Sequence, residues 1–299
     1  MTAQNGFKQD APSRMAVPRA AAPYRAERPR AATPPTPRCA AMGVPASYCG
    51  VTGFKPAPGA FSQRGMVYAC RSFDTISLYT AYPGDAYDIY RVLARHDPRD
   101  CFSPINFAGW HEGVAPTCPW RVATPRADHL KFFGNMETEA LFGNALKRLS
   151  RLGATVTPVD FAPFTSINGL MFFGPFLAER DVSVGAFLDA HPEAGVHVVR
   201  DLIIGSRRHS AADAYRAQYQ IKELQLSLRP FWQSHDAMVV PTVGTVLTIE
   251  AVVCDPLTPN FNNGYYTNFA NHLRATHAGD VLHGGSDCDQ AQVQIRGWI

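Results

Sequence analysis

Two kinds of hydrophobic pattern alternate along the middle of this chain, and the alternation limits its folds more than any other feature. Residues 138–153 carry leucines at helical spacing and end at Gly153. The runs "ATVTPVDF" (154–161) and "DAMVVPTV" (236–243) are short and apolar, which is typical of buried strands. Strands that alternate with helices in this way predict an α/β fold with a largely buried sheet.

Two further elements extend this pattern. The run "HLKFFGNM" (129–136) predicts another buried strand. A long helix is expected from about Ser210 to Trp232, because Ser210 is a favourable N-cap residue. Pro230 is expected to end this helix early or to bend its last turn. With 46% hydrophobic residues in 299, the chain can bury one large core or two small ones.

The two ends of the chain lack this periodicity. Residues 1–38 are rich in Ala, Arg and Pro, and we expect them to form a disordered tail. The same composition would suit a transit peptide, a basic nucleic-acid-binding arm or a segment translated out of frame, although seven prolines oppose the amphipathic helix of a transit peptide. We therefore divide the chain into a disordered tail (1–38), a folded domain (39–273) and an irregular tail (274–299).

The net charge of +3 comes from the N-terminal tail. Residues 1–38 hold seven of the 28 Lys and Arg and two of the 25 Asp and Glu, which leaves 21 basic against 23 acidic residues. A nearly neutral domain argues against nucleic-acid binding, and no apolar run is long enough to span a membrane. Seven scattered cysteines without a CxxC pair favour a reducing, cytoplasmic location. No metal site is expected, because the spacing of His272, His277, His283 and Cys288 matches no compact zinc-binding pattern.

Six segments carry a resemblance to a known family. They occur in the family's order: "VPASYCGVTGFKPAPGAFSQRGMVYACRSFDTIS", "VLARHDPRDCFSP", "DFAPF", "FFGPFLAER", "DAMVVPT" and "GYYTNFAN". From Val44 to about Leu273 the chain resembles the amidase signature family, and within it most closely the allophanate hydrolases. The resemblance implies a mixed sheet sandwiched between helices, and hydrolysis of C–N amide bonds without a metal or organic cofactor. It covers only part of a family domain, so we expect an incomplete version of that fold.

The resemblance also implies which residues should be catalytic. Family members are similar in using a serine nucleophile in an Asp-Thr-Gly/Ala-Gly-Ser motif, a second serine in a Gly-Ser-Ser-rich loop, and a lysine base. Ala41 stands at the nucleophile position. Residues 1–40 contain no Gly-Ser-Ser loop, and Lys8 lacks the apolar neighbours that a lysine base needs. No intact catalytic residue is therefore expected, and loss of a nucleophile alone costs on the order of 10⁶ in turnover.

Three other groups could be suggested as substitute nucleophiles. Ser47 and Cys49 follow the nucleophile position, but we expect both to be packed core residues of a strand. The segment "GGSDC" (284–288) resembles a nucleophile turn, yet it lies outside the matching segments. We assign no catalytic role to any of them.

Substrate recognition is better retained than catalysis. The resemblance implies that a Tyr-x-Gly-Pro-x-x-x-x-Arg motif holds the substrate's carboxylate and amide, and "FFGPFLAER" places Phe172 and Arg180 at those two positions. An arginine fork suits a planar carboxylate. The alternative is that Arg180 forms an ion pair with Glu179 or Asp181 on a helix surface.

Three functions follow as hypotheses. The first is an allophanate hydrolase-like amidase of urea and allophanate nitrogen metabolism that is inactive in this chain. The second is a non-catalytic protein that binds a small carboxylated amide, and the third is a relative of the glutaminase subunit of tRNA amidotransferases. The expected partner is a small-molecule amide, with no nucleic acid and no membrane, and a homo-oligomer is left open.

Overall fold

The described residues form one mixed sheet of seven strands. A computed structural model describes residues 43–105, 119–267, 277–284 and 287–295. Across the sheet the strands follow the order β2-β1-β6-β7-β5-β3-β4. β3 is parallel to β4 and β5, and the other neighbours are antiparallel. The strands are β1 Thr52–Lys55, β2 Leu78–Thr80, β3 Arg121–Pro125, β4 Thr155–Val159, β5 Ala237–Val240, β6 His277–Gly284 and β7 Asp287–Ile295.

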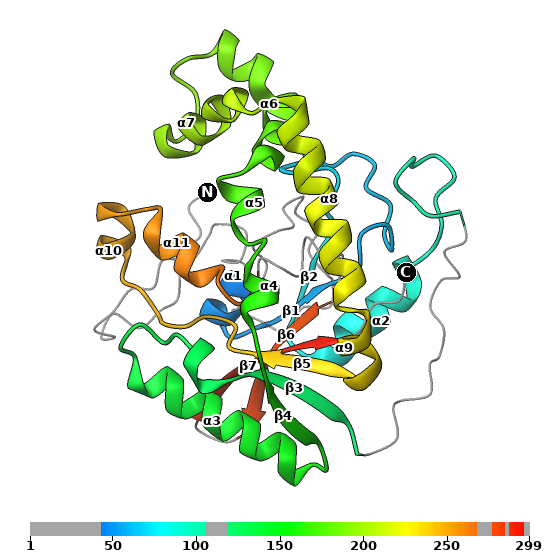
Figure 1. Ribbon diagram of the computed structural model, residues 1–299, viewed down its shortest axis with the longest axis vertical. Coiled ribbons are helices and arrows are strands. Elements are labelled where there is room, and N and C mark those ends of the chain that lie inside the picture. The colour runs from blue at the N-terminus through cyan, green and yellow to red at the C-terminus, as the bar shows by residue number, and fades with distance from the viewer. Residues whose placement is uncertain (1–42, 106–118, 268–276, 285–286, 296–299) are drawn as a thin grey trace.

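Helices surround this sheet (Figure 1). Figure 1 shows α6 and α7 at the end of the molecule opposite α3, with the long α8 running between that end and the sheet. The α-helices are α1 Gly43–Cys49, α2 Pro83–Leu93, α3 Met136–Arg151, α4 Ala162–Thr165, α5 Gly169–Phe172, α6 Ala178–Ala190, α7 His197–Gly205, α8 Ala211–Ser227, α9 Arg229–Ser234, α10 Ile249–Cys254 and α11 Thr258–Asn263. The described residues also form the 3₁₀ helices η2 Ala127–His129, η3 Pro175–Leu177 and η4 Ser206–Arg208.

Strands β3 and β5 are covered on both faces, which the continuous apolar sequence of β5 predicts and the sequence of β3 does not. Val122 and Val239 pack against α3 through Phe142. The neighbouring residues Ala123 and Met238 belong to a second core. Because successive side chains of a strand point to opposite faces, these two cores lie on the two sides of the sheet. The second core also contains Phe161, Phe164, Leu228 and Tyr266. The predicted α/β fold, a mixed sheet sandwiched between helices, is therefore confirmed.

The helix expected at 138–153 is confirmed as α3. The Asn135 side chain accepts a hydrogen bond from the Thr138 amide at 3.0 Å and so caps the first turn. Gly153 follows the helix with φ +92°, a conformation that residues with a side chain rarely adopt. The strand expected at 154–161 follows as β4.

The expected long helix is divided in two. Ser210 and Asp213 form a reciprocal capping box at the start of α8. This helix ends at Ser227, and Pro230 then occupies the first turn of α9, where a missing amide hydrogen costs little. The proline therefore lies in the first turn of a second, short helix and does not bend the first one. The strand expected at 236–243 is confirmed as β5, which ends before Pro241.

Three expectations about local structure are wrong. Residues 129–136 are not a strand, because Phe133 and Gly134 both have positive φ angles, which an extended chain does not allow. The residues after position 42 begin a helix, α1, so Ser47 and Cys49 are helical and not in a strand. The C-terminal stretch expected to be irregular contains β6 and β7, which pair with each other in an antiparallel hairpin.

Candidate substrate-binding site

Two of the segments that carry the family resemblance meet in the structure: the loop 68–75 and the turn 174–180. Gly174 makes the turn possible, because a Cβ atom there would lie 2.6 Å from the Leu170 carbonyl oxygen. Phe73 and Phe176 then pack edge to face, with ring centroids 4.9 Å apart. Ile221 of α8 completes this small core.

Glu179 connects this turn to the loop through hydrogen bonds. Its Oε2 accepts from the Cys70 thiol at 2.6 Å and from the Ser72 amide at 3.1 Å. Its Oε1 accepts from the Ser72 hydroxyl. Burial raises the pKa of the Cys70 thiol, and the negative charge of Glu179 raises it further. Cys70 is therefore a neutral hydrogen-bond donor, not a thiolate nucleophile.

The loop itself is organised around Asp74, which is almost completely buried. Its Oδ2 accepts hydrogen bonds from the Ala69 amide at 2.7 Å and from the Cys70 amide at 3.0 Å. Its backbone carbonyl accepts from the side chain of Gln63. The backbone amide of Gln63 donates to the Asp100 carboxylate at 2.6 Å. These bonds fix the backbone on both sides of Cys70.

Arg207 binds α6 through two ion pairs that are separate from the contacts of Glu179. Its guanidinium contacts Asp181 at 2.9 Å and Asp189 at 2.8 Å. Both acids come from α6, whereas Arg207 lies in η4 after the end of α7. Hydrogen bonds to Asp189 and Asp181 raise the pKa of Arg207, and the bond to Arg207 lowers the pKa of Asp189. The ion pairs therefore join two helices that the sequence separates.

Gly185 allows this ion pair to form, and its substitution tests the contact. A Cβ atom at Gly185 would lie 2.2 Å from the Asp181 carboxylate and 3.1 Å from Arg207. At Gly143 of α3 no atom lies within 4 Å. Gly143→Ala is therefore expected to raise the free energy of unfolding by about 0.5–1 kcal/mol. Gly185→Ala should show no such gain, which urea denaturation of the two variants can measure; equal gains would show that the ion pair contributes nothing.

The structure places Arg180 in the first turn of α6, between Glu179 and Asp181. Its side chain is half-buried, and its positive charge acts on the Cys70 thiol across the turn. A cation is unfavourable in the first turn of a helix, where the dipole is positive, so helix stability does not explain this residue. Phe172 is the last residue of α5. Ala41 lies outside the described residues.

The motif "GYYTNFAN" has a structural role at another place. Tyr266 is completely buried, and its hydroxyl is hydrogen bonded to the backbone of Lys131. The Asn263 side chain donates to the Tyr48 hydroxyl at 2.9 Å, and this hydroxyl donates to the Thr245 carbonyl at 3.3 Å. Burial raises the pKa of Tyr48, which remains a neutral donor. Tyr266 of the motif therefore fixes the segment at Lys131, whereas Asn263, the last residue of α11 directly before the motif, contacts α1, the helix that follows the nucleophile position.

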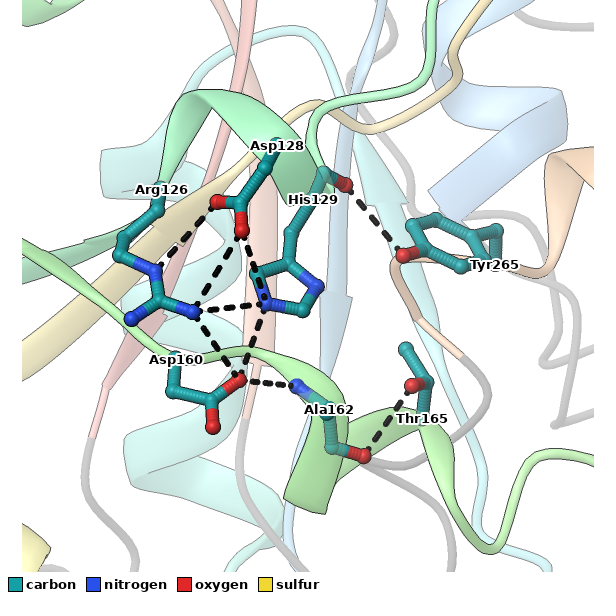
Figure 2. Close-up of polar contacts among 7 residues, drawn as sticks. All are labelled: Arg126, Asp128, His129, Asp160, Ala162, Thr165 and Tyr265. Carbon is teal, nitrogen blue, oxygen red and sulfur yellow. Dashed lines mark hydrogen bonds and ion pairs between the residues drawn. The ribbon is translucent and has the colours of Figure 1, made fainter.

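A polar network that the sequence did not reveal lies at the carboxyl ends of β3 and β4 (Figure 2). Figure 2 shows Arg126, Asp128 and His129 after β3 facing Asp160 after β4. Asp160 contacts the His129 ring at 2.9 Å and accepts from the Ala162 amide at 3.0 Å. Because the charged groups are largely exposed, each pair contributes only about 0–1 kcal/mol. We assign this network to joining the two strand ends.

The described residues show neither a metal site nor a membrane helix. No group of three or more His, Cys, Asp or Glu among them could hold a metal ion. None of the described helices is long and apolar enough to cross a membrane. The prediction about His272, His277, His283 and Cys288 stays untested, because the side chains of these residues lie outside the part of the chain that the structure describes.

Comparison with known proteins gives a consistent family assignment. The amidase family model matches residues 42–275. The urea amidolyase of Saccharomyces cerevisiae is 30% identical over 231 residues, 76% of this chain and 12% of that protein. A glutamyl-tRNA(Gln) amidotransferase subunit of Heliobacterium modesticaldum is 32% identical over 232 residues, 68% of this chain and 46% of that protein.

A solved structure agrees with these sequence comparisons. The allophanate hydrolase of Kluyveromyces lactis superposes with a TM-score of 0.78 and 27% identity, over 86% of this chain and 42% of that chain. The chain thus spans less than half the length of these relatives. With a family match over most of its own length, this chain belongs to the amidase family.

Proposed function

We propose that this chain is an amidase-signature protein of the allophanate hydrolase type that binds a small carboxylated amide and does not cleave it. The observation that carries the proposal is the position of Arg180. It follows a Gly-Pro turn, its positive charge acts on Cys70 of the loop 68–75, and the residues on either side of it are bound to other segments. An arginine held in this way is suited to bind a planar carboxylate with two hydrogen bonds.

The loss of cleavage follows from Ala41 at the position where the family resemblance implies a serine. A methyl group cannot attack an amide carbonyl. The groups around Arg180 do not replace it, because burial and Glu179 keep the Cys70 thiol protonated. The proposed chemistry is therefore recognition of an amide without formation of an acyl intermediate.

Binding of malonamate, which has one carboxylate and one amide, tests this proposal. We expect the protein to bind malonamate in titration calorimetry and to release no ammonia from it. Arg180→Ala should weaken binding by about 10–150-fold, because a hydrogen bond to a charged group contributes about 1.5–3 kcal/mol. Phe172→Tyr should strengthen binding by about fivefold, because it restores one hydroxyl donor worth about 1 kcal/mol.

The control for Arg180 is Arg216→Ala. Arg216 is an exposed arginine of α8 whose ion pair is with Asp213, so its loss should leave malonamate binding unchanged. Equal affinity of the wild type and Arg180→Ala, or no binding by either, would contradict the proposal. Binding of L-glutamine in preference to malonamate would instead favour a relation in function to the tRNA amidotransferases.

A further inference from the structure

We infer that Glu179 is the positioning residue for Arg180, and that it acts through Cys70 and Ser72. The inference rests on the proposed function, in which Arg180 binds the ligand's carboxylate. It concerns a different residue, whose side chain is directed to the loop 68–75 and which is not required to touch the ligand.

The contacts of Glu179 explain how it can hold its neighbour. Both carboxylate oxygens accept hydrogen bonds from a single short segment, the Cys70 thiol and the amide and hydroxyl of Ser72. The amide bond is to the backbone, so it fixes the loop itself and not only a side chain. Glu179 immediately precedes Arg180 in the first turn of α6. The position of the Arg180 backbone therefore depends on this connection.

The surroundings make the connection rigid. Asp74 fixes the backbone amides of Ala69 and Cys70, and the ring of Phe73 in the loop packs against the ring of Phe176 in the turn. On the other side of Arg180, Asp181 is held by Arg207. An arginine between two anchored residues loses less conformational freedom when a ligand binds, which is the general benefit of preorganisation.

Charge and geometry make different demands on position 179, and two substitutions separate them. Glu179→Gln keeps an oxygen that can accept from Cys70 and the Ser72 amide, and its amide group can donate to the Ser72 hydroxyl. Glu179→Ala removes all three contacts. If Glu179 positions Arg180, glutamine should therefore restore what alanine loses.

The experiment measures malonamate affinity by titration calorimetry, well below the melting temperature, for variants whose fold is confirmed by circular dichroism. We expect Glu179→Ala to weaken binding by roughly tenfold or more, as loss of a supporting residue does in other sites. Glu179→Gln should stay within about threefold of the wild type, because it keeps the same geometry. Glu193→Ala is the matched control, since Glu193 is an exposed glutamate paired with His191.

The outcomes distinguish this inference from the proposed function. If Arg180→Ala abolishes binding but Glu179→Ala binds like the wild type, the positioning role is wrong and the proposed function stands. If Glu179→Gln is as weak as Glu179→Ala, the charge of Glu179 matters and the geometry does not, which also overturns the inference. If the wild type does not bind malonamate, both fail. Should Glu179→Ala not fold, Ser72→Ala removes the hydroxyl contact alone, and an unchanged affinity of that variant would also overturn the inference.

Discussion

Replacement of Phe164 by alanine is expected to lower the free energy of unfolding by about 3–5 kcal/mol, a typical cost of removing a buried phenylalanine. Phe164 is 1% exposed and lies at the centre of the core on the α4 side of the sheet. Its ring stacks on Phe161 at 5.6 Å and packs edge to face with Phe231 at 5.1 Å. An alanine would leave a cavity that these rings cannot fill without losing their own contacts.

Equilibrium unfolding in urea measures this effect. Phe164→Leu retains most of the volume and should cost about 1 kcal/mol, within the range for volume-conserving changes. Phe187→Ala is the surface control, because Phe187 is 56% exposed on α6, and it should cost less than about 1 kcal/mol. A loss at Phe164 no larger than the loss at Phe187 would show that this core is not packed as described.

Replacement of Asp74 by alanine should have the second largest effect. The substitution leaves the amides of Ala69 and Cys70 without the acceptor that they have in the structure. A buried donor without a partner costs about 1–3 kcal/mol, and two donors are affected. Removal of a buried carboxylate offsets part of this cost, because its own desolvation is no longer required.

Two measurements test the role of Asp74. Circular dichroism gives the melting temperature of each variant, and calorimetric titration gives its affinity for malonamate. We expect Asp74→Asn to be intermediate, because its side-chain oxygen can still accept both amide hydrogens. Asp88→Ala, on the exposed side of α2, should leave the melting temperature unchanged. Because Asp74 fixes the loop that Glu179 contacts, Asp74→Ala should also weaken ligand binding. A variant with full stability and full affinity would contradict both roles.

The parts of the fold that sequence analysis predicted are those that local patterns determine. The helix α3 has leucines at regular intervals, an N-cap and a terminal glycine, so its limits follow from its own residues. The strand β5 is a continuous apolar run that ends at a proline. In contrast, the β3 sequence RVATP has Val122 as its one large apolar residue, and the more apolar segment 129–136, which follows it in the chain, is the one that hydrophobicity predicts as a strand. Hydrophobicity alone does not separate a buried strand from a buried loop.

In the candidate site, too, only the residues that a local motif marks could be predicted. Arg180 and Phe172 could be selected from the sequence because they lie in a motif. The partners of Glu179 could not, since Ser72 and Glu179 are 107 residues apart. The same holds for Arg207 and Asp181, which are 26 residues apart. No periodicity in one segment records which distant side chain will accept its hydrogen bond.

The contact between Tyr48 and Asn263 also has a consequence for the order of folding during synthesis. The two residues are 215 positions apart. At a ribosome speed of roughly 5–20 residues per second, the Tyr48 segment emerges about 10–40 seconds before its partner exists. During this interval the Tyr48 hydroxyl of α1 lacks the Asn263 side chain that later donates to it, and the apolar residues of α1 are accessible to chaperones. Closure of this part of the domain is therefore a late event that waits for the last third of the chain.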